Sequence, residues 1–136
     1  MKLYYKIWID GIVKLRSRPQ NAGSWKFFAM TFTSMAMALN LVLILLILSD
    51  LGVIDGIWKL PINLFPGTRI DACLSFFVSY LLPFLLLNYF LIFYRGRYKD
   101  LINLYPDYGG KLYLKYFLGS LGVFLVYILI AVLIVK

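Results

Sequence analysis

Apolar residues dominate three stretches of the chain, and each stretch is long enough to cross a lipid bilayer as a helix. They cover residues 27–48, 72–94 and 116–135, and none contains a charged side chain. A helix needs about 20 predominantly apolar residues to span the hydrocarbon core. The pattern therefore predicts an all-α, integral membrane protein with three transmembrane helices.

A different pattern occupies residues 2–17, which read KLYYKIWIDGIVKLRS. Helical spacing puts Lys6, Asp10 and Lys14 on one side of this segment. The same spacing gathers five apolar or aromatic side chains on another side: Tyr4, Ile7, Trp8, Ile12 and Leu15. Aromatic and basic helices of this kind lie in the plane of the membrane interface. We expect an N-terminal interfacial amphipathic helix that ends before Pro19.

The phrase IDGIVKL at residues 9–15 recurs as IDGIWKL at residues 54–60. The sequences around the two copies have few other residues in common. This favours the interpretation that both segments serve the same physical role over an internal duplication. We interpret both copies as segments that hold the chain at a membrane surface. Around the second copy, residues 50–71 form an outer loop with a short helix that begins at Asp50 and ends at Pro61.

Basic residues and tyrosines are concentrated between the second and third apolar stretches. We expect residues 95–104 to continue the second helix beyond the membrane, and YPDYGG to turn the chain back. Residues 95–115 then form a hairpin tip that projects into the cytosol. Three roles stay open for this tip: contact with anionic lipid, docking of a partner protein, or capture of a phosphate-bearing ligand. The basic residues concerned are Arg95, Arg97, Lys99, Lys111 and Lys115.

The sequence of the tip is similar to segments of other proteins. Its sequence FYRGRYKDLINLYPDYGGKLYLKYF, within residues 92–117, resembles segments of uncharacterised small multi-span bacterial membrane proteins. The resemblance implies a multi-span membrane fold for this chain. It implies no activity, cofactor or functional residue.

Composition and charge agree with this interpretation and add an orientation. The 136 residues are 62% hydrophobic and 15% charged, which is too apolar for an ordinary soluble domain. Most of the fourteen Lys and Arg residues lie before residue 27 or within residues 95–115. Because positively charged loops stay in the cytoplasm, we expect a cytoplasmic N-terminus, an extracytoplasmic C-terminus and a location in the inner cell membrane.

Few residues are suited to enzyme chemistry. The chain has neither His nor Glu, and its apolar stretches carry no charge that could serve a proton relay or a metal cluster. Asp50, Asp55 and Asp71 share one loop, but capping and turn roles are more usual for such residues than binding a divalent cation. The single cysteine, Cys73, excludes an intramolecular disulfide. We expect a protein without catalysis, cofactor or metal.

Polar side chains inside the apolar stretches are the remaining candidates for function. An amide that faces lipid leaves its donors and acceptors unpaired, so we expect each to face another helix or a water-filled path. We also expect Pro83 to kink the second span. The candidate pore-lining or interhelical residues are Asn40, Asn88, Ser34, Ser79 and Ser120.

One copy of a three-span chain encloses little volume, so its function requires several copies or a larger partner. The first hypothesis is a homo-oligomeric channel or membrane effector, lined by the polar residues and controlled from the basic tip. The alternative is an accessory or scaffold subunit of a larger membrane complex. Membrane lipids are expected partners in either case.

Overall fold

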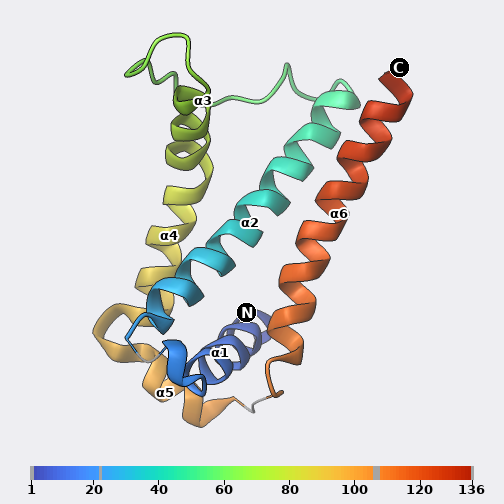
Figure 1. Cartoon of the computed structure of the whole chain (residues 1–136). Helices are drawn as coiled ribbons and strands as arrows, with labels where there is room; N and C mark the ends of the chain where they lie inside the picture. The colour runs from blue at the N-terminus through green and yellow to red at the C-terminus, as the bar shows by residue number, and fades with distance from the viewer. Residues whose placement is uncertain (1, 22, 106–107, 136) are drawn as a thin grey trace.

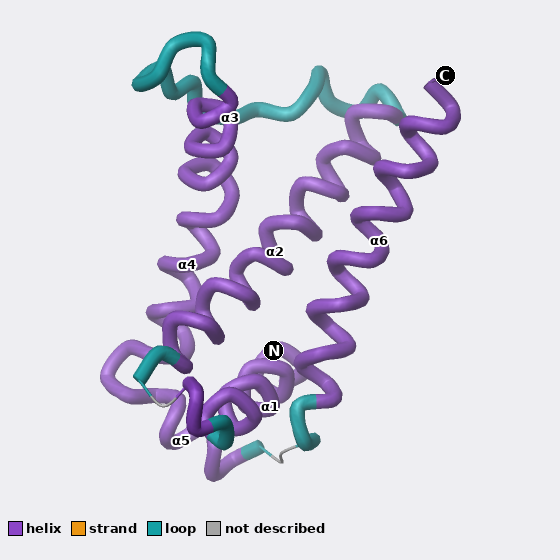
Figure 2. Tube along the Cα trace, in the orientation of Figure 1, coloured by secondary structure: helices purple, strands orange, loops and turns teal. Residues whose placement is uncertain are grey.

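The computed structural model describes residues 2–21, 23–105 and 108–135, and within these ranges it contains helices and no strands (Figures 1 and 2). A 3-10 turn follows α1, π turns precede and follow α4, and a second 3-10 turn precedes α5. The α-helices are α1 (Lys2–Arg16), α2 (Trp25–Asp50), α3 (Arg69–Phe76), α4 (Leu82–Asn88), α5 (Arg97–Leu104) and α6 (Lys111–Val135).

Three helical stretches are long and apolar enough to cross a membrane: Trp25–Asp50, Arg69–Leu104 and Lys111–Ile134. The prediction of an all-helical chain with three such stretches is confirmed. In Figure 1, α2 runs between the α3–α4 stretch on one side and α6 on the other. Helices α1 and α5 gather at one end, which we call the base. Residues 51–68 form a loop at the opposite end.

The α3–α4 stretch is irregular in its middle. A π turn over Phe77–Leu81 comes directly before Leu82 and Pro83. Proline cannot donate a helical hydrogen bond, and its ring crowds the preceding turn. A wider π turn accommodates both effects, so the irregularity expected at Pro83 takes this form.

Residues 97–104 are helical, as expected, but a kink separates them from the helix that they were predicted to continue. Arg95 and Gly96 adopt left-handed backbone angles, with φ of 53° and 71°, and the chain changes direction there. The following helix, α5, packs against α1 at the base. This arrangement buries Tyr98, whose ring lies 5.4 Å from that of Trp25 and 5.8 Å from that of Phe93. Aromatic burial therefore holds α5 against the base, and the projecting hairpin does not form.

The third long helix begins earlier in the chain than predicted. Helix α6 begins at Lys111 rather than at Tyr116, so Lys111–Lys115 belong to its first turns. Gly109 and Gly110 precede it with φ of 67° and 81°. Only glycine adopts such angles without strain, which explains why the helix begins where it does. Residues 106–107, also assigned to the tip, lie outside the described residues.

The short helix predicted within residues 50–71 is absent, since residues 51–68 form turns and extended chain. Asp50 ends α2 instead of starting a new helix. Gly52, Gly56 and Gly67 have φ of 70°, 85° and 81°, which no right-handed helix contains. Local backbone geometry at the glycines therefore overrides the helical spacing of the second repeated phrase.

Helix α1 is present as predicted, but protein covers its apolar side. Trp8, Ile9 and Ile12 are buried in a core cluster with residues of α2, of the π turn after α4 and of α5. The rings of Trp8 and Phe93 meet edge to face at 5.6 Å. Asp10, which helical spacing assigned to a polar side, is completely buried. Its environment is the first feature of the candidate site.

Candidate functional site

The buried carboxylate of Asp10 caps the start of α6. Its Oδ1 accepts hydrogen bonds from the backbone N–H groups of Tyr108 and Gly110, at 2.9 and 2.8 Å. Its Oδ2 accepts one from the N–H of Tyr113 at 2.9 Å. The first N–H groups of a helix have no partner within the helix, and the helix dipole favours a negative charge at that end. Asp10 therefore supplies in α1 the cap that α6 lacks in its own sequence.

Close contact between the two helices depends on a glycine. A Cβ atom at Gly11 would lie 2.4 Å from Cδ2 of Tyr113, well inside van der Waals contact. The absence of a side chain lets the Tyr113 ring lie directly against the α1 backbone. Asp10 thus accepts hydrogen bonds from the start of α6, and Gly11 leaves the space that its close approach requires.

The two copies of the repeated phrase therefore have different structural roles. Asp10 and Gly11 are buried at a helix contact, whereas Asp55 and Gly56 are exposed in the outer loop. A Cβ at Gly56 would meet no atom within 4 Å, and its φ of 85° serves a turn. The shared letters do not indicate a shared site.

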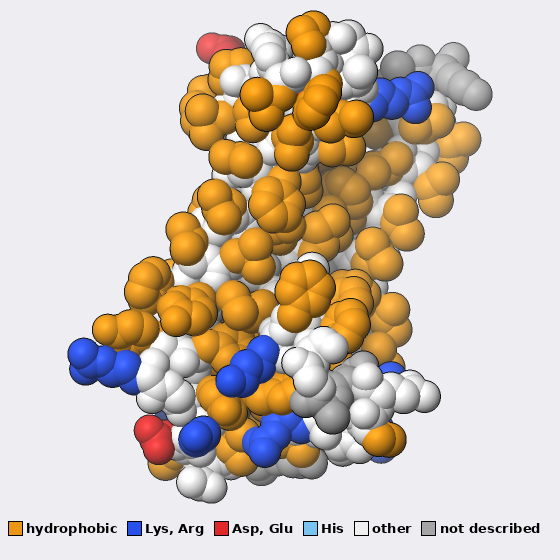
Figure 3. Space-filling model, turned by 60° about the vertical axis from the view of Figure 1, so that its left-hand side comes forward, with side chains coloured by type: hydrophobic (Ala, Val, Ile, Leu, Met, Phe, Trp, Pro, Cys, Tyr) orange, Lys and Arg blue, Asp and Glu red, His pale blue; other side chains and the backbone are white. Residues whose placement is uncertain are grey.

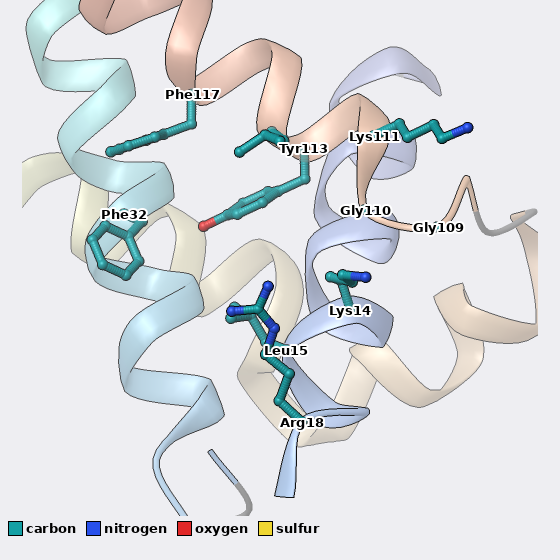
Figure 4. Close-up of a pocket in the computed structure, with 10 residues that line it drawn as sticks. Lys14, Leu15, Arg18, Phe32, Gly109, Gly110, Lys111, Tyr113 and Phe117 are labelled. Carbon is teal, nitrogen blue, oxygen red and sulfur yellow. The ribbon is translucent and has the colours of Figure 1, made fainter. Parts of the chain in front are cut away.

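A groove opens beside the Asp10 cap, with a volume of about 340 Å³ (Figure 4). Lys14 and Leu15 of α1 and Arg18 of the turn after it line one side. Phe32 comes from α2, and the remaining lining residues come from the start of α6 and the turn before it: Gly109, Gly110, Lys111, Tyr113, Leu114 and Phe117. The groove therefore combines basic side chains with an aromatic and aliphatic wall.

The basic residues predicted to form one tip are divided between two places. Helix α1 lies between α5 and the start of α6 and contacts both (Figure 1). Arg95, Arg97 and Lys99 lie at α5 or at the turn before it, and the Arg95 guanidinium packs over the Tyr94 ring at 5.3 Å. Lys111 and Lys115 lie in α6, and Lys111 lines the groove. Sequence reasoning assigned no ligand role to Lys14 or Arg18, the other basic residues of the groove.

Asn88 is the centre of a buried polar network near the base. Its Nδ2 donates to the Ser34 Oγ of α2 at 2.8 Å, and its Oδ1 accepts from the Tyr4 hydroxyl of α1 at 2.6 Å. Asn88 and Ser34 are completely buried. Burial raises the pKa of Tyr4 to about 12. The network joins α1, α2 and α4 through neutral groups.

Asn40 makes the corresponding connection between α2 and α6. Its Nδ2 donates to the Ser120 Oγ at 3.0 Å and to the Tyr116 hydroxyl at 3.3 Å. Ser79 accepts a hydrogen bond from the backbone N–H of Leu60 at 2.8 Å and so anchors the outer loop. All five polar residues singled out in the apolar stretches thus have hydrogen-bond partners within the chain.

The aspartates that flank the loop of residues 51–68 take separate roles. Asp71, in the first turn of α3, accepts hydrogen bonds from the backbone N–H groups of Leu64 and Phe65 at 3.2 and 3.1 Å. Asp50 accepts one from the Tyr127 hydroxyl of α6. No group of three His, Cys, Asp or Glu residues that could hold a metal occurs among the described residues.

No protein-family model, no curated protein and no solved structure matches the chain. Functional inference therefore rests on the site itself.

Proposed function

We propose that the chain is a non-catalytic protein of the inner cell membrane that crosses the bilayer three times and serves as an accessory subunit of a larger membrane complex. In this proposal the base faces the cytoplasm and α6 is the helix that contacts the partner. The partner is a larger membrane protein that offers a transmembrane helix of its own.

The weak packing of α6 within the chain carries this proposal. Its most apolar window is 6% buried inside the molecule, compared with 39% for α2 and 28% for the second span. Leu118, Leu125, Leu129 and Leu133 are all at least half exposed. Gly119 and Gly122 have open space around them and let another backbone approach closely. Such a helix offers nearly its whole length to a neighbour in the bilayer.

The polar side chains favour an accessory role over a channel. A path for ions or solutes needs polar groups that can replace the hydration shell of the permeating species. Asn40 and Asn88 already donate to partners on neighbouring helices, and Ser34, Ser79 and Ser120 already accept hydrogen bonds. A pore built from several copies would have to break these bonds or use the apolar surface of α6.

Charge supports the proposed orientation. In the view of Figure 3, most Lys and Arg side chains gather at the base, and a band of hydrophobic side chains separates them from the outer loop. Positive residues near span ends favour the cytoplasmic side. The exposed surfaces of α1 and α5 would then lie at the anionic inner leaflet.

Co-purification from native membranes, combined with ion-flux measurements, tests the function. We expect the tagged chain to be isolated with a larger membrane protein, and we expect liposomes holding the purified chain alone to conduct no more than empty liposomes. The double variant Leu125→Trp/Leu129→Trp should release the partner, because it adds bulk to the exposed side of α6. The matched control Leu82→Trp/Leu86→Trp makes the same two changes at the same spacing on exposed residues of α4 and should retain the partner.

Conduction by the chain alone would overturn the accessory role and support the homo-oligomeric channel. Flux abolished by Asn40→Leu or Asn88→Leu would then assign the lining to those residues. A purified particle with the mass of one chain, together with no partner in any membrane extract, would contradict both hypotheses.

A further inference from the structure

We infer that the groove between α1 and α6 binds an anionic glycerophospholipid, with its phosphate at the basic residues and an acyl chain along the aromatic wall. This inference rests on the proposed membrane insertion, but it does not depend on the accessory role or on any protein partner.

The basic side of the groove comes from two distant parts of the chain. Lys14 lies near the end of α1, and Arg18 lies in the turn after it. Lys111 is the first residue of α6. In Figure 4 the Arg18 guanidinium points toward the Tyr113 ring, and Lys14 lies between Arg18 and Lys111 in this view. The Lys111 amine extends outward from the start of α6. The three residues are exposed. An anion at this position would be reached from both helices.

Three formal positive charges line the groove, and none of the described residues that line it is acidic. Asp10 is the acidic residue of α1, but it is completely buried and its two oxygens accept hydrogen bonds from the backbone of residues 108–113. Like charges brought together in this way repel each other. A phosphate relieves the repulsion, and a guanidinium binds phosphate in a well-defined, two-pronged geometry.

The opposite wall determines which phosphate compound fits. Phe32 and Phe117 meet edge to face with ring centroids 5.5 Å apart, and Leu114 is more than half exposed beside them. These side chains stand where the apolar stretches of α2 and α6 begin. A soluble phosphate would leave this wall bare, whereas an acyl chain would cover it. The combination therefore fits a lipid with a charged head and an apolar tail.

Gly110 has a specific part in shaping the groove. A Cβ atom there would lie 2.6 Å from Cγ of Lys14, so a larger residue would displace the Lys14 side chain. Its φ of 81° also requires glycine. The turn that starts α6 thus leaves a passage for the stem of Lys14 along the groove margin.

Titration of the purified full-length chain with lipid, followed by native mass spectrometry in neutral detergent, tests the inference. We expect phosphatidylglycerol, which carries one negative charge, to bind at least tenfold more tightly than neutral phosphatidylcholine. The triple variant Lys14→Gln/Arg18→Gln/Lys111→Gln should lose most of this preference. The control Arg95→Gln/Arg97→Gln/Lys99→Gln removes the same formal charge from the α5 side and should change the affinity by less than about twofold.

Two further arms distinguish the sources of phosphate. Glycerol 3-phosphate, which has the head but no tail, should fail to displace phosphatidylglycerol at millimolar concentration. Phe32→Ser should weaken phosphatidylglycerol binding while it leaves the charge unchanged. Helix content and elution volume show that each variant is folded, and the single variant Arg18→Gln replaces the triple variant if the latter fails this check.

Several results would overturn the inference. Equal affinity for the two lipids would show that the groove does not select an anionic headgroup. Equal losses of affinity in the two triple variants would show that the lipid is attracted by the positive charge of the whole base and not by the groove. Displacement by glycerol 3-phosphate would assign the groove to a soluble phosphate compound. None of these results would decide whether a protein partner binds α6, because that question is answered by co-purification.

Discussion

The carboxylate of Asp10 accepts a hydrogen bond at 2.9 Å from the backbone N–H of Tyr113, a residue 103 positions further along the chain. This bond and its two companions fasten the first helix of the protein to the start of the last. They also place the end of α1 beside Lys111, which creates the groove. The arrangement of the base therefore depends on one buried acidic side chain.

Replacing Asp10 by alanine should destabilise the base severely. The variant Asp10→Ala leaves the N–H groups of Tyr108, Gly110 and Tyr113 without their acceptor in a buried site. Losing hydrogen bonds to a charged, buried acceptor costs about 3–5 kcal/mol in total, allowing for partial replacement by water. The measurement is a thermal melt in detergent followed by tryptophan fluorescence, since Trp8 and Trp25 lie in the base.

The second repeated phrase provides the matched control. Asp55 is exposed in the outer loop, so Asp55→Ala should change the unfolding free energy by less than about 0.5 kcal/mol. Equal effects of the two substitutions would mean that Asp10 does not hold α6.

Gly11→Ala should also destabilise the contact between α1 and α6. The new methyl group would overlap the Tyr113 ring, and overpacking of this kind costs about 1–3 kcal/mol. Gly119→Ala, on the open side of α6, meets no atom within 4 Å and should be nearly neutral. A double-mutant cycle with Tyr113→Ala provides the direct check, because Gly11→Ala should cost much less when the ring is gone. Additive effects would exclude the proposed overlap.

Helical periodicity and apolar length were sufficient to predict three long apolar helices and the N-terminal helix. These features depend on residues that are close in sequence. The cap made by Asp10 depends on pairing across the whole chain, and amphipathic spacing placed Asp10 with Lys6 and Lys14. One signal was available: Asp10 stands between Ile9 and Ile12 and next to a glycine, which is unusual for an acid on a solvated side.

The return of α5 to the base was unpredictable for a similar reason. Residues 97–104 have helical character, and only the left-handed angles at Arg95 and Gly96 separate them from the span. What selects those angles is the burial of Tyr98 against Trp25 and Phe93, a contact between distant segments. The glycine in YRGR permitted the break without requiring it.

Removal of the Asn88 amide should loosen the contacts among α1, α2 and α4. Asn88→Ala leaves the Ser34 hydroxyl and the Tyr4 hydroxyl without their present partner. Hydrogen bonds between membrane helices contribute about 0.6–1.7 kcal/mol each, so a loss of about 1–3 kcal/mol is expected. Unfolding by a denaturing detergent measures it, and the exposed Asn103 in α5 provides the control Asn103→Ala. A neutral Asn88→Ala would contradict the network.

Alkaline pH should destabilise the protein through Tyr4. The pKa of an unfolded tyrosine is about 10, and burial raises the pKa of Tyr4 to about 12. Between these values the unfolded chain releases this proton while the folded chain keeps it, so stability is lost as pH rises from about 10 to 12. Melting temperatures of the native chain and of Tyr4→Phe should therefore converge over this interval. A constant difference from pH 8 to 12 would show that Tyr4 ionises as freely as an exposed tyrosine.

The most direct test of the whole account is the accessibility of the two ends of the bundle in intact cells. Single cysteines are introduced as Lys99→Cys at the base and Val53→Cys in the outer loop, in a background in which Cys73 is replaced by alanine; both positions are exposed. With a membrane-impermeant maleimide, we expect labelling of Val53→Cys in intact cells and labelling of Lys99→Cys only after the membrane is permeabilised. Labelling of Lys99→Cys from outside, or recovery of the chain in the soluble fraction, would contradict a three-span protein with a cytoplasmic base.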